Sequence, residues 1–101
     1  MGFLDFLFGA RNSKINDFKK RGGVVLDVRT QEEYDAGHIA GSKHIPLNEI
    51  PKKLKEIESW NKPIITCCLS GGRSGQAAGI LNKNGIKATN GGGWASLKKK
   101  L

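Results

Sequence analysis

The stretch PIITCCLSGGRSGQAAGILN, residues 63–82, places an apolar run, a glycine-rich turn and a helical pattern in immediate succession. Residues 63–68 are compact and apolar, which is typical of a buried strand. From Ser74 to Asn82, small and apolar residues recur at the spacing of one helix face. A strand that passes through a short loop into a helix is the repeating unit of an α/β protein, so this stretch favours that fold class.

The same alternation continues on both sides of this stretch. Periodicity predicts further strands at 24–28, 42–46 and 86–90, and helices over 13–21, 30–37, 48–59 and 94–100. Strands that alternate with helices imply right-handed crossovers, and therefore a parallel sheet covered by helices on both faces. Ligands bind beyond the carboxyl ends of such strands, and Asp27, Arg29 and Cys68 fall at strand ends.

The size of the chain bounds its organisation. Its 101 residues are 38% hydrophobic and 26% charged. We expect a monomer with one domain over residues 1–101, divided into an apolar N-terminal segment at 1–12 and a core at 13–101. No positive charge precedes the N-terminal apolar residues and no stretch is long enough to span a bilayer, so we expect neither a signal peptide nor a transmembrane segment. Residues 1–12 are expected to form a short helix that caps the core, with a membrane-surface or partner-docking role as the alternative.

The balance of charge is basic. The formal net charge is +8, from 17 basic and 9 acidic residues. Such a surface favours anions and could bind nucleic acid weakly. No basic run is interleaved with aromatic residues as in a groove that binds single strands. We therefore interpret the lysines as solvated helix faces and expect no specific nucleic-acid partner.

The two cysteines, Cys67 and Cys68, are adjacent. A bridge between neighbours forces strained geometry, so a disulfide is not expected. Only His38 and His44 could join them as soft metal ligands, and there is no second cysteine pair, so no metal site is predicted. Free cysteines indicate a reducing compartment, and we expect a cytoplasmic protein.

The loop after Cys68 has the composition of an anion-binding loop. Gly71 and Gly72 allow the backbone to curl, which turns successive N–H groups inward. The helix that begins near Arg73 and Ser74 adds positive potential at the same place. A cysteine at the base of such a loop should have a lowered pKa and act as a nucleophile. Strand alternation places Cys67 on the opposite face of the sheet, where we expect it to pack in the core.

Three motifs in order resemble the rhodanese family of sulfurtransferases. The loop CLSGGRS, residues 68–74, is similar to the family's active-site loop, in which a cysteine is followed by four residues, an arginine and a serine or threonine. The upstream stretch VVLDVRTQEEYDAGHIAGSKHIP, residues 24–46, resembles the family's first signature. NGGGW, residues 90–94, resembles the glycines and tryptophan before its last helix. The resemblance covers roughly residues 14–98.

The resemblance implies a fold and a reaction. The fold would be a five-stranded parallel sheet with helices on both faces. Cys68 would take the outer sulfur of a small anionic donor such as thiosulfate and pass it, as a persulfide, to cyanide, a thiol or a protein acceptor. The donor would be held by the loop residues Leu69, Ser70, Gly71, Gly72, Arg73 and Ser74. No metal or organic cofactor would be needed.

The sequence leaves alternatives open for the substrate, the reaction and the role of Arg73. Many members of the family carry a basic or polar residue where this chain has Leu69, so a persulfide, a polysulfide or a protein partner is an alternative to thiosulfate. Counted from Cys67, the loop spacing resembles that of cysteine phosphatases. A non-catalytic docking or redox-sensing module is a third possibility. Arg73 either contacts the donor or turns away to brace the loop.

The charged and imidazole side chains upstream are given structural roles. Asp27, Arg29 and Glu33 are expected to form an ion-pair network near a strand end. An already ionised thiolate needs no catalytic base, so His38 and His44 are interpreted as structural.

Overall fold

The computed structural model describes the backbone of residues 3–101 and the side chains of residues 9–101. Strands and helices alternate along the chain. The strands are β1 (Val24–Asp27), β2 (Lys43–His44), β3 (Ile64–Cys68) and β4 (Ala88–Gly93). The helices are α1 (Phe3–Lys20), α2 (Gln31–Ala36), the 3₁₀ helix η1 (Leu47–Lys52), α3 (Leu54–Ser59), α4 (Gly72–Lys83) and α5 (Trp94–Lys100).

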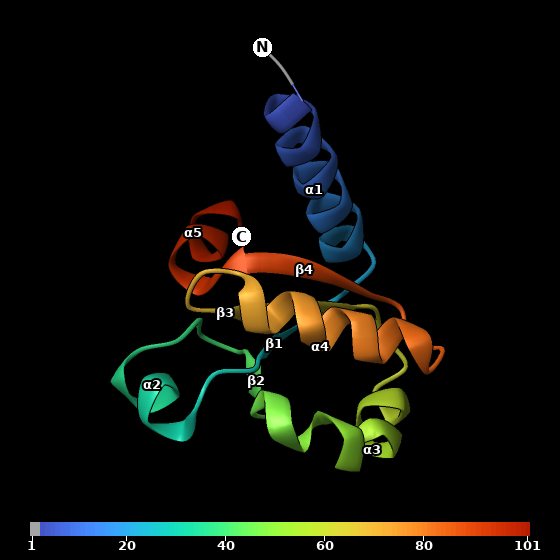
Figure 1. The fold of residues 1–101 in the computed structure, drawn as a ribbon. Helices are drawn as coiled ribbons and strands as arrows, with labels where there is room; N and C mark the ends of the chain where they lie inside the picture. The colour runs from blue at the N-terminus through green and yellow to red at the C-terminus, as the bar shows by residue number, and fades with distance from the viewer. Residues whose placement is uncertain (1–2) are drawn as a thin grey trace.

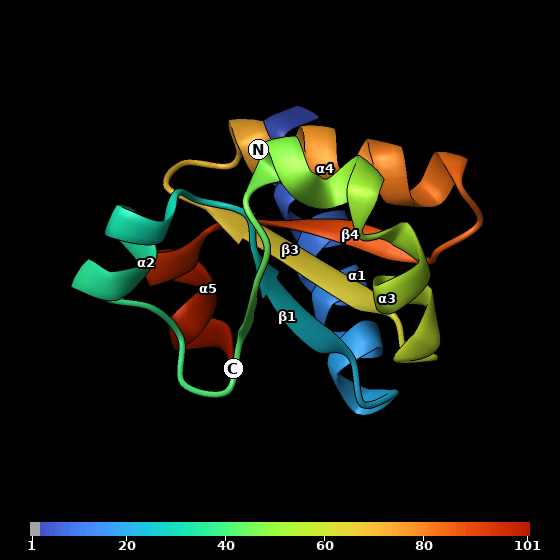
Figure 2. The same cartoon turned by 90° about the horizontal axis from the view of Figure 1, so that it is seen from below.

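The strands form one parallel sheet in the order β2-β1-β3-β4. Helices α4, α3 and η1 cover one face, and α1 and α5 cover the other (Figures 1 and 2). This confirms the predicted α/β class with a parallel sheet between helices. Within the described residues the sheet has four strands, so the expectation of five was wrong in number. Before β1 the described chain is helical from Phe3 to Lys20, because Ile15 and Phe18 recur at helical spacing and both are buried.

Each face of the sheet has its own apolar core. Alternate residues of β3 point to opposite sides, so Ile64 and Cys68 join one core while Ile65 and Cys67 join the other. The first core is completed by α3, η1 and α4, and the second by Ile15 and Phe18 of α1 and by Leu97 of α5. The two adjacent cysteines therefore have entirely different neighbours.

The N-terminal helix is longer than expected. A helix over 13–21 was predicted apart from the segment 1–12, but α1 runs unbroken from Phe3 to Lys20. No proline interrupts it, and Gly9 alone is too weak a breaker to end it. The ribbon of its first turns extends away from the sheet (Figure 1). The predicted packing of the apolar side chains of residues 3–8 onto the core lies outside the described side chains. No helix in the described part of the chain is long and apolar enough to cross a membrane.

Two further boundaries differ from the predictions. The helix predicted over 48–59 is divided at Lys53 into η1 and α3, and Pro51, which cannot donate a backbone hydrogen bond, lies in the 3₁₀ part. The last strand lies later than predicted, at Ala88–Gly93 instead of 86–90. Its glycines allow close approach, because a Cβ on Gly91 would lie 2.7 Å from the carbonyl oxygen of Thr66.

Candidate functional site

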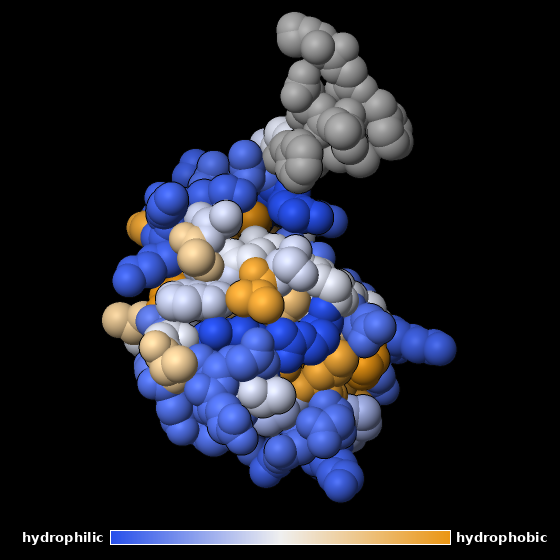
Figure 3. Space-filling model, turned by 60° about the vertical axis from the view of Figure 1, so that its left-hand side comes forward, coloured by the Kyte–Doolittle hydropathy of each residue, from blue (hydrophilic) through white to orange (hydrophobic). Residues whose placement is uncertain are grey.

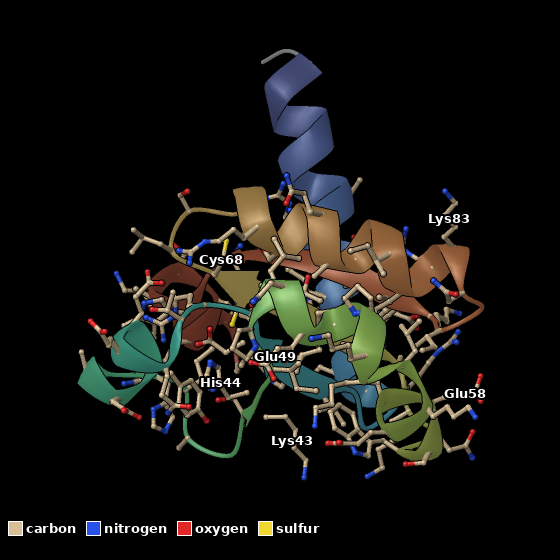
Figure 4. The ribbon with its side chains drawn as sticks, turned by 60° about the horizontal axis from the view of Figure 1, so that its bottom comes forward. Lys43, His44, Glu49, Glu58, Cys68 and Lys83 are labelled. Atoms are coloured by element: carbon tan, nitrogen blue, oxygen red, sulfur yellow. The ribbon has the colours of Figure 1, made fainter. Side chains whose placement is uncertain are left out.

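Cys68 is the last residue of β3, at the carboxyl end of the sheet and beside the start of α4 (Figure 4). The loop that follows turns sharply at Gly71, whose φ of +110° favours glycine strongly over other residues. Helix α4 then begins at Gly72, two residues earlier than predicted. The strand, the turn and the helix start thus surround a single thiol, which is 1% exposed.

Three donor or acceptor groups converge on the Cys68 sulfur. The Gly71 N–H donates to Sγ at 3.0 Å and the Ser74 N–H at 3.3 Å. The Ser74 hydroxyl also lies 3.3 Å from Sγ. The loop therefore curls around its own cysteine, as the glycines predict, and its inward N–H groups meet the sulfur itself.

These hydrogen bonds control the acidity of the thiol. Burial by itself raises the pKa of Cys68, but hydrogen bonds from the Ser74 side chain and from the N–H groups of Ser74, Gly71 and Ser70 outweigh it. The pKa of Cys68 is therefore lowered, as predicted. A thiolate stabilised in this way is the reactive form of cysteine.

Cys67 is the opposite case. It is fully buried in the core formed with α1 and α5, which confirms the predicted packing role. Burial, together with the nearby negative charge of Asp27, raises the pKa of Cys67 to about 12. Both cysteines are free, as expected from their adjacency.

Further hydrogen bonds, from residues of the strands β3 and β4, hold the loop that surrounds Cys68. The Ser74 hydroxyl donates to Asn90 Oδ1 at 2.7 Å, and Asn90 Nδ2 donates to the Gly71 carbonyl at 3.0 Å. Thr66 Oγ1 donates to the Ser74 carbonyl at 2.8 Å. The sequence analysis missed Asn90 and Thr66. The available signal was that each is a polar residue inside a run expected to be a buried strand.

Arg73 points toward α2. Its Nη1 and Nη2 donate to the Glu33 carboxylate at 2.7 and 3.0 Å. The hydrogen bond from Arg73, with further ones from Thr30, lowers the pKa of Glu33 to about 2. Of the two roles considered for Arg73, its contacts favour bracing the loop.

The predicted network of Asp27, Arg29 and Glu33 exists in a divided form. Asp27 and Arg29 make a buried pair at 2.7 Å, and the Arg29 guanidinium also lies 4.7 Å above the Trp94 ring. Glu33 pairs with Arg73 instead, and only its backbone carbonyl accepts from Arg29, at 3.3 Å. Together these contacts join the ends of β1, α2 and α5 next to the loop.

His38 and His44 lie outside the polar contacts of Cys68. His38 Nδ1 is 2.8 Å from the Tyr34 carbonyl, and His44 Nε2 is 2.8 Å from the Arg29 carbonyl. Both rings stack on the Tyr34 ring. These contacts fit the structural role expected of both residues.

The mouth of the loop is apolar at one position. Leu69 is 65% exposed, and Ser70 is also exposed. On the face drawn in Figure 3, hydrophobic residues appear as separate patches in a largely hydrophilic surface. Among the described residues, no three His, Cys, Asp or Glu side chains are grouped so as to hold a metal ion.

Comparison with known proteins gives a consistent result. A family model described as a rhodanese-like domain matches residues 12–100. The chain is 40% identical over 65 residues to the uncharacterized protein YqhL of Bacillus subtilis, covering 64% of this chain and 51% of YqhL. It is 34% identical over 68 residues to the thiosulfate sulfurtransferase GlpE of Pseudomonas fluorescens, covering 67% of this chain and 62% of GlpE.

A solved structure agrees with these matches. A rhodanese-like domain protein from Staphylococcus aureus superposes with a TM-score of 0.70 at 30% identity, over 83% of this chain and 86% of that one. The chain spans less than two thirds of the length of both curated relatives described above. Because the family model covers nearly all of the described core, and the fold and the order of motifs agree with it, the chain belongs to the rhodanese-like domain family.

Proposed function

We propose that the chain is a sulfurtransferase that carries a sulfane sulfur as a persulfide on Cys68. The observation that carries this proposal is the convergence of the Gly71 and Ser74 N–H groups and the Ser74 hydroxyl on one buried sulfur. Hydrogen-bond donors arranged in this way stabilise both a thiolate and a persulfide anion. The relationship to a thiosulfate sulfurtransferase supports the same reaction class.

The first half-reaction loads the sulfur. The Cys68 thiolate attacks the outer sulfur of thiosulfate and a new S–S bond forms. The S–S bond of thiosulfate breaks, and its electron pair leaves with sulfite. The cysteine is left as a persulfide anion, so charge and atoms balance. We propose that the N–H groups of the loop Leu69–Ser74 act as hydrogen-bond donors to the anionic groups in this step. Because these N–H groups already point inward, they need not reorganise as negative charge moves from Sγ to the transferred sulfur.

The second half-reaction transfers the outer sulfur of the Cys68 persulfide to an acceptor. The thiolate of an acceptor, or cyanide in an assay, attacks the outer sulfur of the persulfide. The Cys68 thiolate leaves with its electron pair, and the acceptor becomes a persulfide or thiocyanate. The two half-reactions make a ping-pong cycle with a covalent intermediate, and neither half needs an oxidant, a metal or an organic cofactor.

The exposure of Leu69 bears on the choice of partner. A 65% exposed leucine next to the nucleophile offers no charge to thiosulfate but gives an apolar contact to a larger molecule. A separate hollow of about 310 Å³ includes Arg73 of the same loop in its lining, together with Val28, Pro46 and Leu47, among others. Both features support a thiol acceptor that has an apolar part, including a thiol on a protein.

The alternative of a phosphatase with Cys67 as the nucleophile is not favoured. Cys67 is fully buried on the other face of the sheet, and its pKa is raised to about 12. A thiol in that position is not ionised near neutral pH, and it lies on the face of the sheet opposite the side chain of Cys68. No observation on the described residues specifically favours a non-catalytic docking module.

The test is intact-protein mass spectrometry after incubation with thiosulfate and, separately, with a polysulfide. We expect a gain of one sulfur mass in the native chain and in Cys67→Ala, and no gain in Cys68→Ala. Released sulfite should match the sulfur gained when thiosulfate is the donor. No sulfur gain from either donor in the folded native chain would refute the proposal.

A further inference from the structure

Asn90 makes three hydrogen bonds around the loop, and all of them use its side chain. Oδ1 accepts from the Ser74 hydroxyl at 2.7 Å and from the Gly92 N–H at 2.8 Å. Nδ2 donates to the Gly71 carbonyl at 3.0 Å. Asn90 belongs to β4, so a side chain from the neighbouring strand holds two residues of the loop that contains Cys68.

The orientation of this amide follows from its partners. The Gly92 N–H can only donate, so the amide atom that it meets must be the oxygen. The Gly71 carbonyl can only accept, so the atom that it meets must be the nitrogen. Both conditions hold for the same orientation.

Ser74 has one hydroxyl proton but two neighbours that can accept it. Oγ is 2.7 Å from Asn90 Oδ1 and 3.3 Å from Cys68 Sγ. When Cys68 is a thiol, its S–H can donate to Oγ while the hydroxyl donates to Asn90. When Cys68 is a thiolate, the hydroxyl can turn to Sγ, and Oδ1 keeps the Gly92 N–H as a partner. Asn90 thus holds Oγ by a hydrogen bond in the thiol state, and its hydrogen bond to the Gly71 carbonyl is available in both states.

Gly71 is held in a similar way. Its N–H donates to Sγ at 3.0 Å, and its carbonyl accepts from Asn90 Nδ2. Gly75 provides the space for this arrangement, because a Cβ at position 75 would lie 3.2 Å from Nδ2. A single amide therefore touches Gly71 and Ser74, the two residues whose N–H groups lie within 3.3 Å of the Cys68 sulfur.

We propose that Asn90 is a positioning residue for the nucleophile: it fixes the Gly71 peptide so that its N–H meets the Cys68 sulfur, and it places the Ser74 oxygen 3.3 Å from that sulfur. This inference rests on the proposed role of Cys68. Asn90 does not contact the reacting sulfur itself in these hydrogen bonds. Its effect should therefore appear in the ionisation of Cys68 and not only in folding stability.

Charged groups around the site come from several elements. Arg73 of α4 pairs with Glu33 of α2, and Asp27 and Arg29 pair at the end of β1. Cys67 is the neighbouring titratable group on β3. On the α1 side, a hollow is lined by Arg11, Lys14 and Asn90, among others. Replacing Asn90 by alanine changes none of these charges, so a change in Cys68 ionisation would report on hydrogen bonding.

The experiment measures the rate of alkylation of Cys68 by iodoacetamide as a function of pH, with mass spectrometry to locate the label. We expect Asn90→Ala to raise the apparent pKa of Cys68 and to slow alkylation near neutral pH about tenfold, as for loss of one hydrogen bond to a charged group. Gly75→Ala should shift the profile in the same direction by less. This second variant should favour helix formation, so it keeps the test valid if Asn90→Ala folds poorly.

Asn82→Ala is the matched control. Asn82 also joins α4 to β4 with two hydrogen bonds, and both go to the backbone of Ala88 and not to the loop. It should lower stability but leave the alkylation profile of Cys68 unchanged. Asn90→Ala and Ser74→Ala should also be non-additive, because both act through the same hydroxyl.

Identical pH profiles for the native chain, Asn90→Ala, Gly75→Ala and Asn82→Ala would overturn the proposal. The readout needs no sulfur donor, so it is independent of the proposed reaction. A shifted profile in a chain that gains no sulfur would support the role of Asn90 and refute the sulfurtransferase proposal. Sulfur gain by the native chain with an unshifted profile in the variants would support the sulfurtransferase proposal and refute the role of Asn90.

Discussion

The surroundings of Cys67 and Cys68 differ although the residues are covalent neighbours. Cys67 lies among Ile15, Phe18, Ile65 and Leu97, and its pKa is raised to about 12. Cys68 is almost as well buried, yet its pKa is lowered. Exposure therefore does not separate the two thiols. What separates them is whether hydrogen-bond donors meet the sulfur, since burial without donors disfavours a thiolate.

The largest expected difference between the two cysteines is in sulfur-transfer activity when each is replaced by alanine. Cys68→Ala should reduce sulfur transfer to cyanide by at least about a thousandfold, because no other group can take over a covalent step. Cys67→Ala should retain activity within about threefold and lose about 1 kcal/mol of stability, as a small cavity opens in the core. Thiocyanate formation and denaturant unfolding would measure the two effects. Equal loss of activity from both substitutions would contradict the assignment.

The next effect concerns the donors. Ser74→Ala removes the hydroxyl 3.3 Å from Sγ, and should raise the pKa of Cys68 and slow its alkylation near neutral pH about tenfold. Ser70→Ala is the control, because Ser70 contributes through its backbone N–H, which alanine keeps. A pH profile of alkylation would measure both variants. A Ser74→Ala profile that matches Ser70→Ala would show that the hydroxyl has no part in the difference between the cysteines.

A smaller effect is expected from the brace between α2 and α4. The pKa of Glu33 is about 2 in the folded protein, below its usual value. The stability from its pair with Arg73 is therefore present above about pH 4.5 and is lost as pH falls toward 2. The side chains are 29% and 35% exposed, so solvent screening reduces the contribution to about 1 kcal/mol.

Glu33→Gln tests this prediction. The variant should be less stable than the native chain at pH 7, and the difference should shrink by pH 3. Denaturant unfolding at both pH values would measure it, with Glu32→Gln as the control, because the Arg73 hydrogen bonds go to Glu33. A difference that stays constant between pH 7 and pH 3 would show that the ion pair is not its source.

The smallest effect is expected at the mouth of the loop. Leu69→Lys places a positive charge beside Cys68 without touching the core, because Leu69 is 65% exposed. We expect the KM for thiosulfate to fall about threefold, as for one added charge near the surface. Leu69→Gln is the uncharged control. A KM that rises equally in both variants would show that the leucine itself contacts the donor.

Much of the fold and part of the site followed from local pattern. Apolar runs and capping residues predicted most elements to within a few residues, and the loop composition predicted a lowered pKa for Cys68. The errors occurred where pattern is weak. Glycine has no side-chain periodicity, so the strand Ala88–Gly93 was placed too early. The prediction also divided the N-terminal region into a segment 1–12 and a helix 13–21. One helix runs from Phe3 to Lys20 instead, because residues 3–12 carry no strong helix breaker.

The sequence by itself determined the alternation of strands and helices, the family and the separation of the two thiols onto opposite faces, since these depend on spacing along the chain. Only the tertiary structure decided which side chains support the loop. Arg73 meets Glu33 across 40 residues, and Ser74 meets Asn90 across 16. Such partners depend on how β1, β3 and β4 lie side by side, and no local periodicity records that arrangement.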